Sequence, residues 1–372
     1  MSGVPDKRKA DNDAGTSSSY STTSLVKRPR TDDPNDAAAL ILSGQSAAAA
    51  TGALSRTVKR TSALAAPIML LTGHGGELFT AKFSPDGQSV VSGSFDKSIF
   101  LWKTYGDCSN YAVLKGHKSA VIEVQWGREG DVVYSVSADK SMCQWDVPTQ
   151  TRLRKHVGHT DIVNTCAVSR KGREQLATGG DDCSVKIWDP REKQAVYTIS
   201  EKWQVTALEW SADGQNLFVG GLDNQIKAYD LRRPEPLYTL SGHMDTITGL
   251  RISPDGSRLL SNGMDNTVRT WDVRPFAPGS RLVGVYEGAP HGFEKYLIRP
   301  CWSSDGAFVA AGAADRTVLV WNVDTRKIVY KLPGHKGVVT EVGWHPKEPI
   351  VLSCSTDKTM YLGEVNPDEV RF

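Results

Sequence analysis

The sequence predicts an all-β protein in which seven copies of a four-stranded unit close into a ring, the architecture of a β-propeller. Three observations predict it: an aromatic residue that recurs at similar intervals, an aspartate at a fixed distance before it, and short strand-like segments separated by turn sequences. A single four-stranded unit cannot bury both faces of its sheet, so units of this length must pack against neighbours, and a closed ring leaves none exposed. The 372 residues are therefore not divided into the two or three domains that length alone suggests.

The recurring aromatic sets the period of the repeat. It stands at intervals of 43, 43, 41, 42 and 50 residues, followed 42 residues later by a glycine: Trp102, Trp145, Trp188, Tyr229, Trp271, Trp321 and Gly363. Six residues before each of these positions stands an aspartate: Asp96, Asp139, Asp182, Asp223, Asp265, Asp315 and Asp357. Because this spacing holds in all seven units, it indicates a structural constraint.

Four units add a histidine and a hydroxyl to the aspartate and the aromatic. The histidine precedes the aspartate by 22 or 23 residues, and the hydroxyl precedes the aromatic by ten. The complete sets are His74, Ser92, Asp96 and Trp102; His117, Ser135, Asp139 and Trp145; His159, Thr178, Asp182 and Trp188; and His243, Ser261, Asp265 and Trp271. The other units lack at least one member, and Val219 and Ala311 replace the hydroxyl in two of them.

The strands and the closure of the ring follow from the segments between these landmarks. The first unit contains strand-like segments at 79–83, 89–92 and 98–102, with a Ser-Pro-Asp-Gly turn at 84–87. After residue 365 only seven residues remain, too few for a turn and a fourth strand, so the last unit is one strand short. The apolar segment 67–71 belongs to no earlier unit. We expect it to supply the missing outer strand and so remove two open sheet edges.

The repeat resembles the WD40 family, whose units of about 40 to 45 residues begin near Gly-His and end near Trp-Asp. The matching dipeptides are Trp145-Asp146, Trp188-Asp189, Tyr229-Asp230, Trp271-Asp272 and Trp321-Asn322. The resemblance implies that each histidine, hydroxyl, aspartate and aromatic forms a buried hydrogen-bonded chain, here called a tetrad, that ties the Gly-His loop to the tight turn and the third strand. We expect residues 67–372 to form the propeller and residues 1–66, which lack the repeat, to form a disordered tail.

Serine, histidine and aspartate are also the residue types of a hydrolase triad. Copy number argues against catalysis, because an enzyme needs one site and the set recurs in four units. We find no other catalytic pattern, and therefore predict no enzyme, no catalytic residue and no small-molecule substrate. The six cysteines form no C-x-x-C pair, so no metal or cofactor is expected. No apolar run reaches the roughly 20 residues of a membrane span.

Charge distinguishes the tail from the ring. The tail contains two basic clusters separated by 17 residues, the pattern of a bipartite nuclear import signal: Lys7, Arg8 and Lys9, then Lys27, Arg28 and Arg30. A solvated charge cluster is the alternative, but we favour the signal and predict a nuclear protein. The ring holds 35 basic and 36 acidic residues. Because phosphate contacts dominate affinity for nucleic acids, RNA contact is expected to be peripheral at most.

The interval between the fifth and sixth aromatics is the longest and contains two additional segments, 272–278 and 291–295. With these segments the whole propeller resembles the WD-repeat subunits of the U5 small nuclear ribonucleoprotein. That resemblance implies a non-catalytic scaffold of the spliceosome in pre-mRNA splicing, docked on the large U5 scaffold protein beside other spliceosomal proteins. An alternative comes from Arg191 and Arg274, which follow Trp-Asp as in substrate receptors of cullin-type ubiquitin ligases. Such arginines can also simply pair with nearby carboxylates.

Candidate partner-binding residues are large apolar side chains at positions expected to be exposed. In the family, the residue before the tight-turn aspartate points to one face, and three of these residues are large and apolar: Phe95, Leu222 and Met264. The alternative is that they pack beneath adjacent loops. The additional segments supply a second group, because a loop longer than the repeat requires is usually retained for contact or is disordered: Pro275, Phe276, Pro278 and Phe293.

Overall fold

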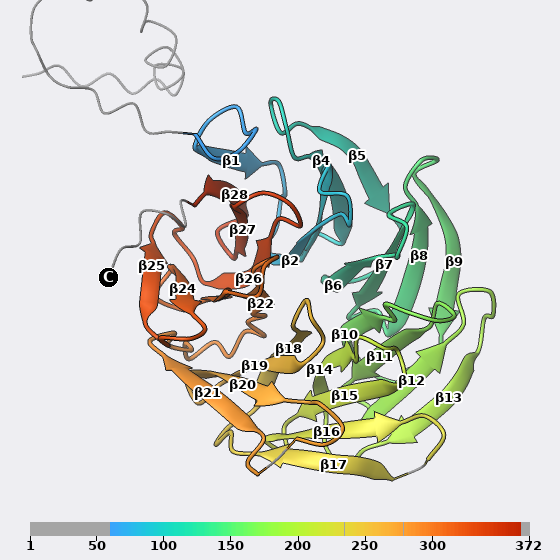
Figure 1. Cartoon of the computed structure of the whole chain (residues 1–372). Helices are drawn as coiled ribbons and strands as arrows, with labels where there is room; N and C mark the ends of the chain where they lie inside the picture. The colour runs from blue at the N-terminus through green and yellow to red at the C-terminus, as the bar shows by residue number, and fades with distance from the viewer. Residues whose placement is uncertain (1–59, 234, 278, 366–372) are drawn as a thin grey trace, which may run out of the picture. The chain divides into compact units, whose positions relative to one another are not determined.

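The structure, a computed structural model, describes residues 60–233, 235–277 and 279–365. These residues form 28 strands in seven four-stranded antiparallel sheets, arranged around a ring in Figure 1. No helix lies among them, and hence none that is long and apolar enough to cross a membrane. The predicted all-β, seven-bladed WD40-type propeller is confirmed.

Each blade takes four strands, with the strand nearest the channel written first. Blade 1 contains β2 (Leu78–Phe83), β3 (Ser89–Ser94), β4 (Ser98–Lys103) and β5 (Asn110–Lys115). Blade 2 contains β6 (Val121–Trp126), β7 (Val132–Ser137), β8 (Ser141–Asp146) and β9 (Thr151–Val157). Blade 3 contains β10 (Val163–Val168), β11 (Leu176–Gly180), β12 (Ser184–Trp188) and β13 (Ala195–Ser200). Blade 4 contains β14 (Val205–Trp210), β15 (Asn216–Gly221), β16 (Gln225–Asp230) and β17 (Pro236–Ser241).

The remaining three blades follow the same order. Blade 5 contains β18 (Ile247–Ile252), β19 (Arg258–Gly263), β20 (Thr267–Asp272) and β21 (Leu282–Glu287). Blade 6 contains β22 (Cys301–Trp302), β23 (Phe308–Gly312), β24 (Val318–Asn322) and β25 (Ile328–Leu332). Blade 7 contains β26 (Val339–Trp344), β27 (Ile350–Ser355), β28 (Thr359–Glu364) and, as its outer strand, β1 (Ile68–Thr72).

The core lies between adjacent blades. Val91 and Leu101 of blade 1 pack with Val124 and Trp145 of blade 2 in one buried cluster. Along each blade, burial decreases outward: every residue of β14 is buried, whereas most of β17 is exposed. The innermost strands contact one another in sequence, and β26 returns to β2. Burial of both sheet faces is therefore achieved only by closure of the ring.

The outer strand of blade 7 comes from the N-terminal side of the propeller, as the sequence predicts. β1 pairs antiparallel with β28, with Ile68 opposite Gly363 and Thr72 opposite Thr359. Leu71 of β1 is buried in the core cluster that joins blades 7 and 1. Both ends of the described chain thus lie in one sheet, which closes the ring.

The segment 60–66, which the prediction assigned to the tail, contacts blade 7. Arg60 Nε and Thr61 Oγ1 each donate to the Glu364 carboxylate over 2.7 Å. The backbone N–H of Ser62 donates to the same carboxylate over 2.9 Å, and Leu64 is buried with Leu71. Residues 1–59 of the predicted tail, with both basic clusters, lie outside the described residues.

The loops divide between two faces, because alternate connections in an up-and-down sheet lie at opposite ends of the strands. We call one the His face: it carries the Gly-His loops between blades and the tight turns between second and third strands. The additional segment at 291–295 follows β21 and lies on the His face, whereas the additional residues near Phe276 join β20 to β21 on the opposite face. The long interval thus contributes to both faces of the ring.

Candidate functional site

The structure brings the four residues of each complete tetrad into one buried chain. In blade 1, His74 Nδ1 lies 2.9 Å from Asp96 Oδ2 and His74 Nε2 lies 2.8 Å from Ser92 Oγ. Trp102 Nε1 donates to the same Ser92 oxygen over 2.8 Å. The equivalent distances in blades 2, 3 and 5 fall between 2.7 and 3.2 Å.

Proton positions in the blade 1 tetrad follow from its donors. The indole N–H of Trp102 can only donate, so the Ser92 oxygen accepts it and gives its own proton to His74 Nε2. His74 Nδ1 then donates to Asp96. Burial raises the pKa of Asp96, but hydrogen bonds from Ser98 and His74 outweigh it and bring the pKa to about 2. Burial also lowers the pKa of His74. A neutral imidazole and an ionised carboxylate therefore form a brace, and the fully buried Ser92 hydroxyl meets no solvent.

The tetrad makes a direct prediction for stability. In blade 2, Ser135→Ala leaves Trp145 Nε1 and His117 Nε2 without their shared partner in a buried site. We expect the free energy of unfolding to fall by about 1–3 kcal/mol, measured by chemical denaturation. The control is Ser109→Ala on the neighbouring blade 1, where the side chain is exposed; it should change stability by at most about 0.5 kcal/mol. Equal effects of the two variants would contradict a bracing role.

Blade 4 replaces the histidine with a carboxylate. Tyr229 donates to Glu201 Oε1 over 2.6 Å. Lys227 Nζ lies 2.7 Å from both Glu201 Oε2 and Asp223 Oδ2. Burial and the Glu201 contact raise the pKa of Tyr229. The sequence search missed Glu201 because it looked for Gly-His, although Glu201 stands 22 residues before Asp223, the spacing of the histidines.

Blade 7 also keeps most of the arrangement. His335 Nδ1 lies 3.1 Å from Asp357 Oδ2, and His335 Nε2 lies 2.8 Å from Ser353 Oγ. Gly363 provides no indole, but the Tyr361 ring packs edge-on against His335, with 4.7 Å between ring centroids. Tyr361 stands four residues after its aspartate, as does Phe100 of blade 1, which stacks on His74.

Blade 6 departs furthest from the pattern. His291 forms no tetrad: its Nε2 lies 3.3 Å from Asn262 Nδ2, and its backbone N–H donates to Asn266 of blade 5. Burial lowers the pKa of His291 to about 4. Trp321 Nε1 donates instead to the backbone carbonyl of Glu287 over 3.0 Å. The histidine of the long interval therefore ties blade 5 to the loop that follows it.

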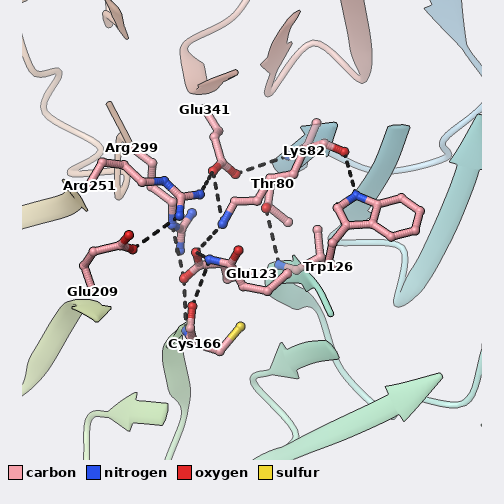
Figure 2. Close-up of polar contacts among 12 residues, drawn as sticks. Thr80, Lys82, Glu123, Trp126, Cys166, Glu209, Arg251, Arg299 and Glu341 are labelled. Carbon is pink, nitrogen blue, oxygen red and sulfur yellow. Dashed lines mark hydrogen bonds and ion pairs between the residues drawn. The ribbon is translucent and has the colours of Figure 1, made fainter. Parts of the chain in front are cut away.

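A second polar system, which the sequence analysis did not identify, lines the channel (Figure 2). Lys82 Nζ lies 2.6 Å from Glu123 Oε1 and 3.4 Å from Glu341 Oε1. Arg251 lies 3.4 Å from Glu209 and 3.7 Å from Glu341. Lys82 and Arg299 hold the pKa of the buried Glu123 below its usual range, although burial itself raises it. The pairs of Lys82 with Glu123 and of Arg251 with Glu209 join consecutive blades, whereas those with Glu341 join blades 1 and 5 to blade 7.

Arg299 is the most connected member of this channel network. Its backbone N–H donates to Thr340 of blade 7, while its guanidinium donates to the carbonyls of Phe79 in blade 1 and Asn164 in blade 3. Its Nε lies 3.5 Å from Glu123 of blade 2. Arg299 lies two residues before β22 of blade 6. Its side chain therefore crosses the channel to reach these other blades.

One signal in the sequence could have revealed part of the network. Lys82, Glu209 and Arg251 all occupy the same place, one residue before the large residue that ends the innermost strand. Charged residues in otherwise apolar inner strands are costly unless they are paired. The position of these residues in the strands does not predict which cation pairs with which carboxylate.

The candidate partner-binding residues lie on two faces. Phe95, Leu222 and Phe293 are exposed on the His face and Met264 is half-buried there. The ring of Phe95 packs against that of Phe79, with 6.3 Å between centroids. Part of this exposed side chain therefore packs within the protein, which was the alternative to partner binding.

Two further exposed residues on the His face were missed, Trp203 and Met244. Met244 follows a Gly-His pair, where the other complete units carry Gly75, Lys118 and Thr160. Asn224 Nδ2 donates to the Met244 carbonyl, which joins the blade 4 turn to the next loop. We call the group on blades 4 to 6 the apolar arc: Trp203, Leu222, Met244, Met264 and Phe293.

Pro275 and Phe276 are exposed on the opposite face, and Pro278 lies outside the described residues. Arg191 and Arg274 each pair with the aspartate of their own repeat end: Arg191 Nε lies 3.3 Å from Asp189 Oδ1, and Arg274 Nε lies 3.0 Å from Asp272 Oδ1. Both arginines thus pair with nearby carboxylates, which is the simpler interpretation of their position.

Comparison with known proteins supplies relatives for the whole propeller. The WD domain, G-beta repeat model matches residues 65–103, 108–146, 298–322 and 326–362, and a model of the nucleolar protein 10-like N-terminal domain matches residues 133–289. The U5 small nuclear ribonucleoprotein 40 kDa protein of Bos taurus is 52% identical over 87% of this chain and 90% of its own. Its namesake in Homo sapiens is 53% identical over 82% of this chain and 86% of its own. The pre-mRNA-splicing factor cwf17 of Schizosaccharomyces pombe is 43% identical over 97% of this chain and all of its own.

Proposed function

Because this chain belongs to the family of the U5 small nuclear ribonucleoprotein 40 kDa protein, we propose that it is a non-catalytic interaction scaffold of the U5 particle in pre-mRNA splicing. Its partners are the large U5 scaffold protein and other spliceosomal proteins, with RNA contact at most peripheral. The use of serine, histidine and aspartate as buried braces supports a role without catalysis. A rigid ring with two loop faces is suited to holding several proteins at once.

The apolar arc carries this proposal. Its five large side chains come from loops and turns of blades 4 to 6 and share one face. Clustered exposed apolar side chains mark protein interaction sites, and aromatic residues are frequent anchors of such interfaces. We therefore place the contact with the large scaffold protein on the His face.

Co-purification from nuclear extract tests both the function and the surface. Tagged full-length protein should recover U5 RNA and the large scaffold protein. The double variant Met244→Asp/Phe293→Asp should reduce that recovery at least about tenfold, since it introduces charge at exposed side chains that the partner would cover. The control is Phe276→Asp, an equally exposed aromatic on the opposite face. Absence of U5 RNA with the unaltered protein would reject the proposed function. Loss of recovery with the Phe276 variant alone would move the contact to the other face.

We also propose that the protein is nuclear, imported through the two basic clusters of the tail. Alanine at Lys27, Arg28 and Arg30 should shift a fluorescent full-length fusion from nucleus to cytoplasm, because import receptors bind such clusters through their charge. Arginine at Lys7 and Lys9, which keeps the charge, is the control and should leave the fusion nuclear. Unchanged nuclear fluorescence of the alanine variant would contradict the assignment of these residues.

A further inference from the structure

The channel contains a cavity of about 550 Å³ at the ends of the innermost strands. We call it the funnel; its walls include Lys82, Trp126, Arg170, Glu209, Arg251 and Trp344. The volume is within the roughly 300–1,000 Å³ typical of ligand pockets. The rim consists of the turns that follow the inner strands, where Pro85, Arg128 and Pro254 are exposed. The funnel therefore opens on the face opposite the His face.

The other end of the channel is obstructed by the segment that precedes β22. Tyr296 donates to Glu77 of the blade 1 loop over 3.3 Å, and its ring centroid lies 6.3 Å from that of Phe79. Below it, Arg299 crosses from blade 6 to blades 1, 2 and 3. Neither Tyr296 nor Arg299 is part of the funnel wall. A ligand can accordingly approach the funnel from the face opposite the His face.

The charges around the funnel do not balance. Four cations and three carboxylates form one connected set of ion pairs: Lys82, Arg170, Arg251 and Arg299 with Glu123, Glu209 and Glu341. The residues that line the cavity itself include four cations, Lys82, Arg128, Arg170 and Arg251, and two carboxylates, Glu209 and Glu341. The wall thus has two positive charges in excess, whereas the rim turns outside the wall carry aspartates such as Asp86 and Asp255. Buried charge is tolerated when it is paired, so an anion inside the funnel would be favoured.

The excess charge is concentrated at two guanidinium groups that border the cavity. Arg170 reaches Glu209 over 3.2 Å, yet its side chain is 42% exposed. Arg251 lies 3.4 and 3.7 Å from its two carboxylates, longer than the roughly 2.7–2.9 Å of a strong charge-assisted hydrogen bond. Both groups thus keep donors that a ligand oxygen in the cavity could use. Figure 2 shows Arg251 between Glu209 and Glu341.

We propose that the funnel binds a carboxylate of an extended protein segment, seated between Arg170 and Arg251. The carboxylate is an aspartate or glutamate side chain or a C-terminal carboxyl group, and Trp126, Trp344 and Pro85 contact the apolar residues beside it. A carboxylate fits better than a dianionic phosphate, because the buried Glu209 and Glu341 carboxylates would repel the second charge. This proposal does not depend on the splicing function.

Binding of defined peptides to the full-length protein tests the proposal. The probes are acetyl-Ala-Leu-Glu-Leu-Ala-amide, its Gln and phosphoserine counterparts, and acetyl-Ala-Leu-Leu-Ala with a free C-terminus. Titration calorimetry measures affinity, and substitution of a wall residue reports the location. We expect the glutamate peptide to bind at least about tenfold more tightly than the glutamine peptide, which is about 1.4 kcal/mol. Its affinity should fall as salt increases.

Two variants locate the contact. Arg170→Ala, a half-exposed residue at the wall, should weaken binding of the glutamate peptide at least about tenfold. The variant should remain folded with a small change in the thermal midpoint, because Glu209 keeps Arg251 as a partner. The matched control is Arg274→Ala, another arginine paired with a carboxylate on the same face but outside the funnel; it should bind as the unaltered protein does. Circular dichroism of each variant verifies folding.

Each outcome of the peptide titrations supports or overturns one part of the proposal. Binding of either carboxylate peptide with loss in the Arg170 variant supports the proposal and identifies a side chain or a C-terminus as the source. Equal binding of the glutamate and glutamine peptides, or no binding at millimolar peptide, overturns it. Tighter binding of the phosphoserine peptide overturns the choice of a carboxylate. An Arg170 variant that binds normally overturns the location.

Discussion

Replacement of Arg299 by alanine is expected to lower the free energy of unfolding by about 3–5 kcal/mol, the usual cost of removing one partner of a buried ion pair. The side chain is almost completely buried, and its guanidinium lies near Glu123 and donates to the Phe79 and Asn164 carbonyls. Its loss leaves two carbonyls without this donor and leaves Glu123 with fewer positive neighbours. The effect should therefore exceed that of any single tetrad substitution.

The Arg299 effect also has a topological reason. Strand pairing in each of the seven sheets joins strands of the same blade, whereas this side chain joins blade 6 to blades 1, 2 and 3 across the channel. Inter-blade contacts decide whether a repeat ring unfolds as one unit. We accordingly expect the Arg299→Ala transition to be broader as well as earlier.

Guanidinium denaturation followed by tryptophan fluorescence measures the change. Arg274→Ala is the control, since that arginine is exposed and, among the described residues, forms its ion pair with its neighbour Asp272. Arg299→Lys keeps the charge but not the fork of donors, and should recover only part of the stability. A loss below about 1 kcal/mol for Arg299→Ala would show that the crossing contacts contribute no more than a surface pair.

Stepwise removal of the N-terminal residues is expected to have its largest effect when β1 is lost. Deletion of residues 1–59, which lie outside the described residues, is the reference. Deletion of 1–66 removes Leu64 and the contacts to Glu364, and deletion of 1–72 also removes Leu71. Each buried leucine contributes about 1.5–3 kcal/mol, so the largest deletion should cost at least about 3–6 kcal/mol.

Loss of β1 also exposes a sheet edge. β28 would present unpaired backbone groups along residues that now pair with Ile68–Thr72. Open, apolar edges promote pairing with other chains, so the protein lacking 1–72 should form soluble aggregates as well as melting early. Differential scanning fluorimetry and size-exclusion chromatography of the three deletions measure both effects. The idea that β1 closes the ring would be wrong if the 1–72 deletion remained monomeric and as stable as the 1–59 deletion.

The fold could be predicted closely because the contacts that define each blade are made between residues of the same repeat unit. Asp96 accepts hydrogen bonds from the Ser98 N–H in its turn and from His74 Nδ1. It stands six residues before Trp102, and an aspartate at this distance from the equivalent position recurs in all seven units. Closure could also be predicted, because the last unit lacked a strand and 67–71 had no unit. The segment 60–66 was not predicted to pack, since the contacts of Arg60 and Thr61 with Glu364 join residues about 300 positions apart.

The candidate surface could be predicted only in part. Exposure of Phe95, Leu222 and Phe293 was expected from their place in the turn or loop, and the structure shows these side chains exposed. Met264 is only half-buried, and Phe276 is on the other face. A turn position predicts that a side chain leaves the core, but not which neighbouring loop covers it.

By itself the sequence determined the number of blades, their strands, the members of the four complete tetrads and the strand that closes the ring, because these depend on spacing within one unit or on the count of units. Only the tertiary structure decided how Lys82, Glu123, Arg251, Arg299 and Glu341 pair in the channel, and that the two additional segments face opposite sides. The physical reason is that electrostatic pairing depends on distance in space. A closed ring brings together inner strands from every blade at no fixed separation along the chain.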